Sequence, residues 1–597
     1  MNADYNFQTT ISVYAQSTPQ KLAIQYGDET ITYQVLELKI RSLSKQLQIG
    51  GVRKGDIVAI CFSNSIELIV SIYAVLCMGA VVLPINIDAP IERVRTIFLD
   101  SQPSVALCKK ALQREIAQLN MKSIVVDLTD TDSSVEVVND NNDEITGNDD
   151  AFCIYTSGST GTPKGVLLSY QGVVNHALAK AKLLSVTENS KICLSFNVGF
   201  VASIWQILVP ILSGATLVIY DKDLIKKPYQ FFRQLDKDQI SAISLTPHTV
   251  SAYMEFFRIG KQKLSLANMR QIILTGEKVD GNLVVEFYKH YEHIDLINAY
   301  GQTECSDDTY HYMIPHSFKA TNVPIGTPIP NIKGFILNEN FEESEFGELY
   351  ISGIGVSRGY LHNLELTEQK FLNLSFSKMP LYKTGDLVRK DDNGYFIYLG
   401  RVDNQVKIRG HLIELEEIET HINQYEGVSQ SIVRAVDLNE GGKILEAIYT
   451  GTENVNRNAL KEYLSARLPV YMLPAKFTQI DSFSYTVNGK IDRKNINIPI
   501  ESNDSIQDSD ATDEISGLQR KAFVTIKSNI DESVFPNISI NTNLLDIGVD
   551  SITFIKIVVS LEEAFDFEFD DEMLLFAAFP TIRSMIDYVE SKVIGDD

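Results

Sequence analysis

The sequence predicts an α/β protein with a large N-terminal part, a small α/β part and a mostly helical C-terminal part. Up to residue 400, short Val/Ile/Leu-rich runs alternate with helical patterns, which is typical of parallel sheets covered by helices on both faces. The pattern restarts at Gly400–Asp403, so residues 401–500 predict a second, smaller α/β unit. A polar, acidic stretch at 501–515 then precedes residues 516–597, which are mostly helical in pattern.

The candidate strands of the large part are short apolar runs between helical patterns. They are Ile57–Cys61, Ala80–Leu83, Ser123–Val126, Phe152–Tyr155, Thr216–Ile219, Ile272–Leu274 and Ile294–Ile297. One uncharged stretch, 68–87, has the length of a membrane span. Because Gly79 and Pro84 divide it, we predict a buried helix at Leu68–Met78 followed by a buried strand.

Composition and charge exclude several classes of protein. Hydrophobic residues make up 44% of the 597 residues and charged residues 22%, as in an ordinary globular protein. The net charge of −24 disfavours nucleic acid as a partner, because phosphates would be repelled. The six cysteines occur singly, without metal-ligand spacing, and the N-terminus lacks a signal-peptide pattern. We therefore expect a cytoplasmic protein with no membrane partner.

The acidity is concentrated near the C-terminus. Residues 501–515 contain six acidic residues and no Lys or Arg, which predicts a solvated linker. Residues 516–597 contain fifteen acidic and six basic residues. This tail is either merely a well-solvated domain or a mobile domain with an acidic docking surface.

The most informative segment is 152–165, an apolar strand followed by a loop. The loop Thr156–Lys164 holds two glycines, five hydroxyl residues and a lysine. Glycine lets backbone N–H groups turn toward an anion, hydroxyls add donors, and Lys164 adds a positive charge. The segment therefore predicts a nucleotide phosphate site, although Pro163 distinguishes it from the common P-loop.

Three further segments carry polar groups suited to a nucleotide. Asn298–Glu304 combines an aromatic ring, a glycine turn, a hydroxyl and a carboxylate, which can stack on a base, touch a phosphate and hold Mg²⁺. Tyr382–Leu387 places Asp386 after a glycine turn, where it can accept hydrogen bonds from ribose hydroxyls. Asn488–Arg493 places Lys490 on a turn, where the ordinary interpretation is a surface lysine.

Taken together, these segments resemble the adenylate-forming superfamily, and most closely the adenylation domains of nonribosomal peptide synthetases. The resemblance extends over nearly the whole chain, and the matching segments follow the family's order. They are Ile31–Tyr33, Leu76–Asn86, 152–165, Ala299–Glu304, Gly347–Leu361, Tyr382–Leu387, Gly400–Glu419, Leu468–Pro474 and Asn488–Arg493. One departure is Glu416, where these enzymes usually have glycine. The resemblance implies a large N-terminal subdomain at 1–400 and a small mobile C-terminal subdomain at 401–500.

The resemblance implies a role for each polar residue of these motifs. Tyr300 would lie against adenine, Thr303 near the α-phosphate and Glu304 on Mg²⁺. Asp386 would bind the ribose of ATP, with Arg401 nearby. The expected ligands of the β- and γ-phosphates belong to the loop and are Thr156, Ser157, Gly158, Thr160 and Lys164.

Two catalytic residues are implied in the small subdomain. Asp403 would be the hinge about which it rotates, and Lys490 would bridge the substrate carboxylate and the α-phosphate. A cation placed there lowers the repulsion between two anions in the transition state. Because the lysine is on the mobile subdomain, closure would assemble the site and exclude water.

The tail resembles a peptidyl carrier domain of the four-helix type. In Leu544–Ile552 an apolar run leads to Asp550 and Ser551, and an amphipathic helical pattern follows. Ser551 would open a helix, whose N-terminus tolerates a phosphate. The resemblance implies that Ser551 carries 4′-phosphopantetheine, attached by a phosphopantetheinyl transferase; taken alone, it would be an ordinary N-cap serine.

The substrate pocket departs from that of enzymes for α-amino acids. Phe200–Ser203 stands where those enzymes have Phe-Asp-x-Ser, so Val201 replaces the aspartate that pairs with the α-ammonium. A second alignment uses Phe196–Gly199 and places Asn197 there, as in activators of aryl acids. The spacing from Trp205 to Gly214 favours the first alignment.

Two adjacent acids point to the class of substrate. The implied pocket residues are Val201, Ala202, Trp205, Ser244, Ile273, Thr275, Ala299, Asp307 and Asp308. A buried, unpaired carboxylate costs several kcal/mol, so at least one of Asp307 and Asp308 is expected to meet a ligand cation. We therefore expect a β-amino, ω-amino or guanidino acid. The alternatives are that both are solvated loop acids and that the substrate is an α-amino or aryl acid.

The expected function is ATP-dependent formation of an acyl-adenylate, followed by thioester loading onto the protein's own carrier domain. An acyl-CoA ligase would share the first 500 residues, but it would not need the carrier-like tail. Gly355–Gly359 formally matches a hydrolase nucleophile elbow, yet it lies within a segment that matches the adenylate-forming family. No condensation or thioesterase segment is found, so we expect a downstream condensation or other synthase protein to take the acid in trans.

Overall fold

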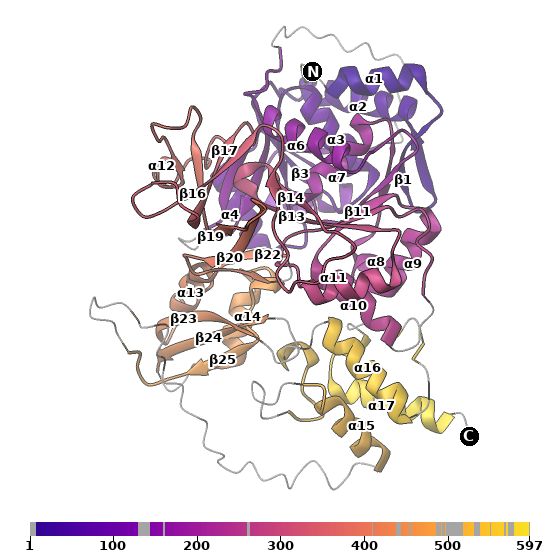
Figure 1. The fold of residues 1–597 in the computed structure, drawn as a ribbon, viewed down its shortest axis with the longest axis vertical. Coiled ribbons are helices and arrows are strands. Elements are labelled where there is room, and N and C mark those ends of the chain that lie inside the picture. The colour runs from indigo at the N-terminus through magenta and orange to yellow at the C-terminus, as the bar shows by residue number, and fades with distance from the viewer. Residues whose placement is uncertain are drawn as a thin grey trace.

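The structure is a computed structural model of the chain. It describes residues 7–128, 144–158, 162–258, 263–408, 410–437, 443–452, 455–484, 491, 493, 496, 517–530, 538–547, 549, 551–565, 567, 569–570, 573 and 578–595. Figure 1 shows the large subdomain above, with the small subdomain and the C-terminal helices side by side below it.

Two mixed sheets form the centre of the large subdomain. The nine-stranded sheet has the order β15-β14-β13-β12-β11-β9-β10-β1-β2, and the six-stranded sheet has the order β6-β5-β3-β4-β7-β8. Both are parallel in their interior; the first is antiparallel at both edges, and the second is antiparallel only at β7–β8, because its other edge strand, β6, pairs parallel with β5. The strands of the first sheet are β1 (Leu22–Tyr26), β2 (Glu29–Thr32), β9 (Lys191–Leu194), β10 (Thr216–Ile219), β11 (Ala242–Leu245), β12 (Gln271–Leu274), β13 (Asp295–Gln302), β14 (Asp307–Met313) and β15 (Thr327–Pro328). Those of the second are β3 (Ile57–Cys61), β4 (Val81–Pro84), β5 (Val105–Cys108), β6 (Ser123–Val125), β7 (Asp150–Thr156) and β8 (Lys164–Ser169).

Helices connect these strands and cover the sheets. They are α1 (Phe7–Ser17), α2 (Tyr33–Ile49), α3 (Ile66–Cys77), α4 (Ile91–Ser101), α5 (Gln113–Gln118), α6 (Tyr170–Leu183), α7 (Ala202–Leu212), α8 (Lys222–Ile225), α9 (Pro228–Asp238), α10 (Pro247–Arg258) and α11 (Gly281–His290). The uncharged stretch is divided as expected, because α3 ends before Gly79 and β4 follows. Among the helices described, none combines the length and the apolar character that a membrane crossing requires.

A third sheet of the large subdomain differs from the prediction of parallel strands. Its strands are β16 (Ile332–Leu337), β17 (Phe346–Gly353), β18 (Phe371–Leu372), β19 (Leu381–Lys390) and β20 (Phe396–Arg401), and all pair antiparallel. Short connections join most of these strands, which suits antiparallel pairing, whereas a parallel pair needs a long crossover. The one intervening helix in this region is α12 (Leu364–Lys370).

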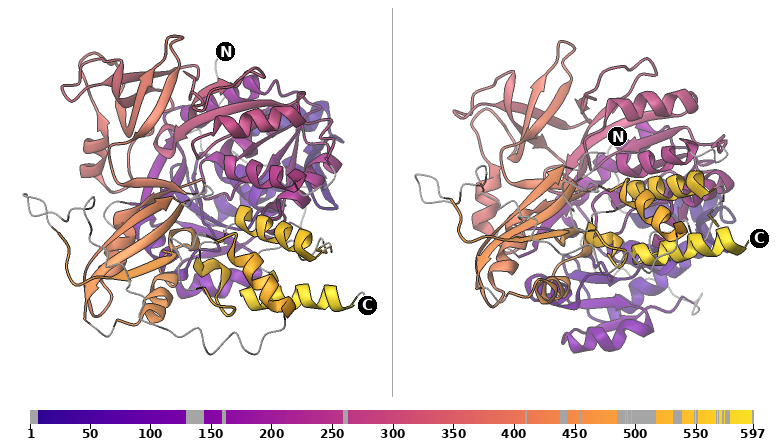
Figure 2. Two further views of the ribbon diagram at one scale, coloured as in Figure 1. Left: turned by 60° about the horizontal axis from the view of Figure 1, so that its bottom comes forward. Right: turned by 90° about the horizontal axis from the view of Figure 1, so that it is seen from below.

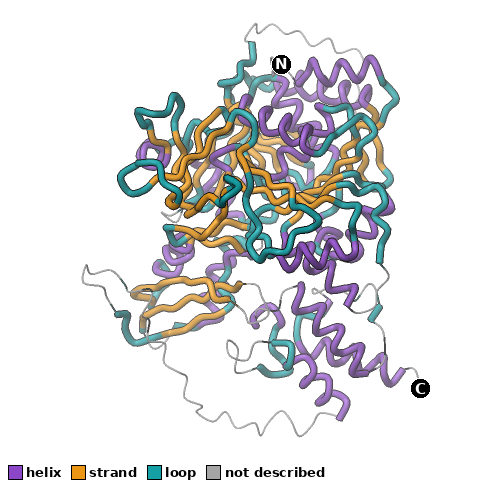
Figure 3. Tube along the Cα trace, in the orientation of Figure 1, coloured by secondary structure: helices purple, strands orange, loops and turns teal. Residues whose placement is uncertain are grey.

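The small subdomain begins with a hairpin and continues with a three-stranded sheet. The hairpin is β21 (Gln405–Ile408) and β22 (His411–Glu414); the sheet is β23 (Val428–Asp437), β24 (Lys443–Gly451) and β25 (Lys476–Gln479). Helices α13 (Leu415–Asn423) and α14 (Arg457–Ser465) pack with it, and Figure 3 shows the strands of this unit in orange beside purple helices. The predicted boundary at 400/401 falls within the last residues of β20, and the hairpin starts only after Asp403.

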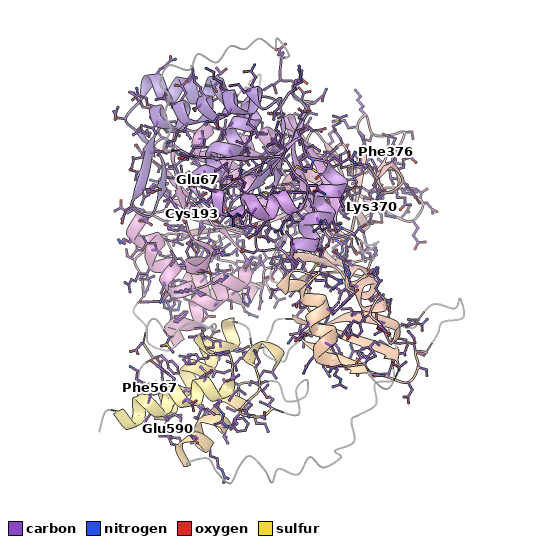
Figure 4. The ribbon with its side chains drawn as sticks, turned by 180° about the vertical axis from the view of Figure 1, so that it is seen from behind. Glu67, Cys193, Lys370, Phe376, Phe567 and Glu590 are labelled. Atoms are coloured by element: carbon purple, nitrogen blue, oxygen red, sulfur yellow. The ribbon has the colours of Figure 1, made fainter. Side chains whose placement is uncertain are left out.

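The C-terminal residues form a helical unit with its own apolar core. The described helices are α15 (Gly517–Lys527), a 3₁₀ segment at Leu544–Ile547, α16 (Ser551–Phe565) and α17 (Ile582–Gly595). As the helical pattern predicts, Ile555, Val558 and Leu561 of α16 are buried. Figure 4 shows this unit from behind, with Phe567 labelled in it and Cys193 in the large subdomain. The predicted linker at 501–515 lies outside the described residues.

The helical unit packs against the large subdomain and the small one. Its core cluster includes Phe256 of α10 and Ile444 of β24, which are 2% and 5% exposed. The views in Figure 2 agree that α16 lies close to the end of α10. An apolar contact therefore joins the C-terminal helices to both other parts of the molecule.

Candidate active site

A cavity of about 260 Å³ lies between the large and small subdomains. The loops after β7, β12 and β13 and the segment before α7 line it from the large subdomain. The small subdomain contributes Lys407, the hairpin residues Gly410–Leu412, and Pro469 and Tyr471. Ligands of open α/β sheets commonly bind at the carboxyl ends of parallel strands, and this cavity has that position.

The predicted phosphate loop connects β7 and β8 at one end of the cavity. Thr156 and Lys164 are paired across the two strands, so the chain reverses between them. A Cβ on Gly158 would lie 2.0 Å from the Thr162 carbonyl oxygen, so only glycine fits there. The Thr156 hydroxyl is buried and has no hydrogen-bond partner among the described atoms. Thr160 lies outside the described residues.

Groups of the small subdomain accept hydrogen bonds from this loop. The Gly158 N–H donates to Glu417 Oε2 at 3.1 Å, and the Ser157 hydroxyl donates to the Leu412 carbonyl at 2.9 Å. Lys164 Nζ lies 3.6 Å from Glu414 Oε1. The positions predicted for phosphate oxygens therefore face two carboxylates that belong to the small subdomain.

A buried ion pair fixes one of these carboxylates. Arg93 of α4 donates to Glu417 Oε1 at 2.6 Å, and the two side chains are 9% and 0% exposed. Burial raises the pKa of Glu417, although Arg93 and the Gly158 N–H oppose that shift. Sequence reasoning missed this pair, because the two residues are 324 positions apart and Glu417, although it lies in the matching segment Gly400–Glu419, was given no role there.

The predicted magnesium ligand lies beside the phosphate loop. Glu304 is 4% exposed, accepts a hydrogen bond from the Tyr360 hydroxyl at 2.7 Å, and lies 3.7 Å from Lys164 Nζ. Thr303 lines the cavity next to it. A carboxylate, a hydroxyl without a partner and a lysine in one place are the donor set that a magnesium–triphosphate group requires, so these residues fit that group.

The predicted adenine and ribose residues form one hydrogen-bonded network. The Tyr300 hydroxyl donates to Asp386 Oδ2 at 2.5 Å, and Gln302 donates to the same oxygen at 2.9 Å. Arg401 lies between Asp386 and Asp403, with donor–acceptor distances of 2.6 Å to each. The predicted ribose ligand and the predicted hinge are thus joined through one guanidinium group. Burial and Asp386 raise the pKa of Tyr300 well above its usual value.

The hairpin β21–β22 covers the nucleotide end of the cavity. Lys407 Nζ lies 5.5 Å from the centre of the Tyr300 ring, and the Gly410 N–H donates to Glu277 at 2.9 Å. The His411 ring stacks on Tyr471 with centroids 3.7 Å apart and meets the edge of Phe200. Burial lowers the pKa of Lys407. The predicted catalytic lysine, Lys490, lies outside the described residues.

The predicted acyl pocket is at the other end of the cavity. Six of its nine predicted residues line the cavity: Val201, Ala202, Thr275, Ala299, Asp307 and Asp308. The other three, Trp205, Ser244 and Ile273, are fully buried and are not among the lining residues. Residues of the alternative alignment, Phe196, Asn197 and Gly199, also line the cavity.

The two adjacent acids are buried, which excludes the interpretation that they are solvated loop residues. Asp308 accepts from Lys180 Nζ at 2.7 Å and from the Thr275 hydroxyl at 2.9 Å. Lys180 is 0% exposed and also lies 3.1 Å from His311 Nε2. Burial alone would raise the pKa of Asp308, but Lys180 outweighs it and lowers that pKa to about 2. Asp308 is therefore paired with a cation of the protein itself.

Asp307 has a different environment. Its φ of 100° is in the left-handed region, and its Oδ2 is buried without a hydrogen-bond partner in the described structure. His176 Nε2 lies 3.6 Å away, but burial and Lys180 lower the pKa of His176 to about 3, so the ring is neutral. Burial and the charge of Asp308 raise the pKa of Asp307 well above its usual value.

Lys180 and His176 were also missed by sequence reasoning, although a signal for them exists. The buried face of α6 includes Val173, His176, Ala177 and Lys180, which follow one another at helical spacing. A lysine on the apolar face of a helix is rarely fully buried without a partner. That position alone could have indicated that an acid elsewhere in the chain pairs with it.

Ser551 is the first residue of α16, as the motif predicted. The start of a helix offers free N–H groups and a partial positive charge, which favour a phosphate. The helix is fifteen residues long and packs its apolar face into the carrier core. The local backbone therefore fits a phosphopantetheine attachment site.

The fold and the cavity define a nucleotide-binding α/β enzyme fused to a helical carrier domain, and comparison with known proteins agrees. Residues 11–361 match the model of the AMP-binding enzyme family, and residues 531–589 match the phosphopantetheine attachment site. Because the first match covers more than half of the chain, the chain belongs to the AMP-binding enzyme family.

Curated relatives align over nearly the whole chain. It is 32% identical to tyrocidine synthase 1 of Brevibacillus parabrevis over 594 residues, which is 98% of this chain and 52% of that protein. It is 33% identical to gramicidin S synthase 1 of Brevibacillus brevis over 585 residues, 96% of this chain and 51% of that one. The chain thus spans about half of the length of these two relatives.

Solved structures share the same fold. An NRPS protein with adenylation and PCP domains, bound to a vinylsulfonamide inhibitor, aligns with a TM-score of 0.80 at 19% identity, over 98% of this chain and 97% of that one. An artificially fused adenylation–PCP di-domain from Klebsiella oxytoca aligns with a TM-score of 0.69 at 24% identity, over 79% and 93%. The predicted fold class, with a carrier domain at the C-terminus, is confirmed.

These matches also confirm the resemblance and the enzyme class. The protein is an adenylate-forming ligase with a carrier domain, a class that uses ATP with Mg²⁺ and carries 4′-phosphopantetheine. The individual site residues and the domain boundaries stay predictions.

Proposed function

We propose that the protein activates a small carboxylic acid with ATP as an acyl-adenylate and loads it as a thioester onto its own carrier domain. One observation carries this proposal. A single cavity joins the phosphate loop, the Tyr300–Asp386 network and the acyl pocket, so an acid and a nucleotide would meet end to end within it.

In the first step, a carboxylate oxygen of the substrate attacks the α-phosphorus of ATP, and the bond to pyrophosphate breaks. Lys164 and the Gly158 N–H would hold the leaving phosphates, and Lys490 would supply the cation between the two reacting anions. Mg²⁺, when bound at Glu304, would screen the charge of the phosphates.

In the second step, the acyl group moves to the carrier domain and AMP leaves. The pantetheine attached at Ser551 would supply the thiol for this transfer. The described structure supports a separate arrangement for this step, because Glu414 and Glu417 of the small subdomain lie against the donors that phosphates would need. Rotation about Asp403 would exchange that arrangement for the one in which Lys490 reaches the acid.

The proposed substrate is a β-amino, ω-amino or guanidino acid. Val201, where an α-amino acid enzyme has its aspartate, lines the cavity and cannot pair with an α-ammonium. The buried acids Asp307 and Asp308 line the same pocket, and Asp307 Oδ2 has no hydrogen-bond partner among the described residues, so a distal cation of the substrate would find an acceptor there. The alternative of an aryl acid is favoured by one observation, which is that Asn197 also lines the cavity.

The proposed partners follow from the carrier domain. A phosphopantetheinyl transferase would modify Ser551, and a downstream condensation or other synthase protein would accept the loaded acid in trans. The named relatives are peptide antibiotic synthases, which supports nonribosomal peptide or hybrid biosynthesis as the setting.

Intact-mass analysis tests the proposal. The full chain is incubated with a phosphopantetheinyl transferase, CoA, ATP, Mg²⁺ and single acids of the α-amino, β-amino, ω-amino, guanidino and aryl classes. We expect the mass to rise by one acyl group with one distal-nitrogen acid. Release of acyl-CoA without any gain in protein mass would instead favour an acyl-CoA ligase.

Two variants assign the steps. Lys490→Ala should slow ATP–pyrophosphate exchange by about a hundredfold or more, because the anions lose their shared cation. Ser551→Ala should exchange at the normal rate and never gain the acyl mass. Full-rate exchange by Lys490→Ala would contradict the proposed mechanism.

A further inference from the structure

We infer that Lys180 is a specificity-determining residue of the acyl pocket: it neutralises Asp308 from within the protein and leaves Asp307 as the acid that meets the substrate's distal cation. This inference rests on the proposed function. It adds which of the two acids, Asp307 or Asp308, contacts the distal cation of the substrate, and the physical reason. Lys180 belongs to α6, outside every motif of the nucleotide site.

The first step of the argument is the charge of Asp308. Lys180 Nζ and Asp308 Oδ2 are 2.7 Å apart, and their side chains are 0% and 2% exposed. Thr275 donates to the other oxygen, and the Trp205 ring lies 5.4 Å from the same ammonium. Both oxygens of Asp308 thus have partners, and its charge is balanced without a ligand.

The second step is that Asp307 has no such balance. Charged and titratable groups near it are His176 and Lys180 from α6, and Asp308 and His311 from β14. Of these, only Lys180 is a cation, since burial keeps both histidines neutral, and Lys180 is already bonded to Asp308. Asp307 Oδ2 is buried and lacks a partner in the part of the chain that the structure describes. A ligand ammonium or guanidinium would supply that missing partner.

The third step excludes a metal ion as the intended partner. His176, Asp308 and His311 have ligand atoms within 4.8 Å of one another, a spacing that could hold a metal. Lys180 Nζ contacts both Asp308 and His311, at 2.7 and 3.1 Å. The ammonium therefore takes the place of a cation among these residues, and the histidines serve to accept from it or to pack beside it.

Three variants separate the roles, with ATP–pyrophosphate exchange as the readout. The acids tested share one chain length and end in an amine, a methyl group or a carboxylate. Asp307→Asn should lower the ratio of kcat/KM for the amine-ended acid to that for the methyl-ended acid by about tenfold or more, because only the amine-ended acid loses a charge pair. Asp308→Asn should leave Lys180 without its anion and raise kcat/KM for the carboxylate-ended acid.

The double variant Lys180→Met/Asp308→Asn restores charge balance. The rise in kcat/KM for the carboxylate-ended acid that Asp308→Asn causes should disappear in the double variant, and the preference for the amine-ended acid should remain. If Lys180 had a merely structural role, these two results would not occur together. Exchange with the methyl-ended acid reports that each variant is folded, and the double variant serves if Asp308→Asn alone does not fold.

The inference is overturned if Asp307→Asn keeps the full preference for the amine-ended acid, or if Asp308→Asn abolishes that preference without admitting the carboxylate. Wild-type protein that prefers the methyl-ended acid would also overturn it. A wild-type protein that exchanges with no carboxylic acid would instead refute the proposed function, so the two failures are distinguishable.

Discussion

The two ends of the cavity balance their charges in different ways. At the phosphate end, Gly158 and Lys164 of the large subdomain face Glu417 and Glu414 of the small subdomain. At the acyl end, Lys180 and Asp308 both belong to the large subdomain. In the proposed rotation of the small subdomain, partners across the boundary would be exchanged, whereas partners within one subdomain would persist. Under that proposal, the phosphate end would release and rebind anions, and the acyl end would keep a constant charge.

The largest expected effect comes from breaking the persistent pair. Lys180→Met should lower the free energy of unfolding by about 3–5 kcal/mol, because it leaves the Asp308 charge buried without its partner. Denaturant unfolding of the full chain, followed by fluorescence, measures this change. Lys182→Met, on the exposed side of the same helix, is the control and should stay close to wild type. Equal stability of Lys180→Met and the control would show that the pair is not held as the structure places it.

A smaller effect is expected from loosening the exchangeable pair. Glu417→Gln removes the charge that faces Arg93 and the Gly158 N–H. The contact between the small subdomain and the phosphate loop would then lose the free energy of one charged hydrogen bond. We expect acyl transfer to the carrier to slow by about tenfold, while ATP–pyrophosphate exchange is retained or faster. Single-turnover loading, followed by intact mass, measures the transfer.

Glu416→Gln is the matched control for that prediction. Glu416 precedes Glu417 in α13, but it accepts from Asn404 at 2.8 Å rather than from the phosphate loop. The comparison between the two ends fails if both variants slow the transfer equally, or if Glu417→Gln slows only the exchange reaction.

The smallest expected effect is a pH dependence at the acyl end. Burial and Asp308 raise the pKa of Asp307, so its carboxyl stays protonated above the usual range and ionises only as pH rises through the raised value. An amine-ended acid needs the ionised form, so its kcat/KM for exchange should rise with pH across that range. The methyl-ended acid, and any acid with Asp307→Asn, should lack this rise. A rise of the same size in Asp307→Asn would assign the titration to another group.

Local patterns predicted much of the fold and the nucleotide end of the site. The strands Ile57–Cys61 and Thr216–Ile219 have the predicted bounds, because a buried parallel strand is a short apolar run between helical segments. Thr156, Tyr300 and Glu304 were each predicted from a short motif and line one cavity, and Asp386, predicted in the same way, is hydrogen-bonded to Tyr300.

What the sequence did not reveal depends on contacts between distant segments. Lys180 is 128 residues from Asp308, and Arg93 is 324 residues from Glu417, so no local spacing connects either pair. The prediction that at least one of the two acids meets a ligand cation left open which one, and no local pattern indicated that Lys180 supplies a cation to Asp308. The antiparallel sheet β16–β20 was missed because its short strands were read with the parallel pattern of their neighbours.

The apolar contact between the C-terminal helices and α10 would affect any movement of these helices away from the other two parts of the molecule. Phe256 belongs to the large subdomain and Ile444 to the small one, and both are buried in one apolar cluster with residues of those helices. If the carrier domain moves to another protein, as proposed, this apolar contact would be broken, and the hydrophobic effect would favour its re-formation. A downstream acceptor protein of the proposed kind would therefore have to compete with this apolar contact for the carrier domain.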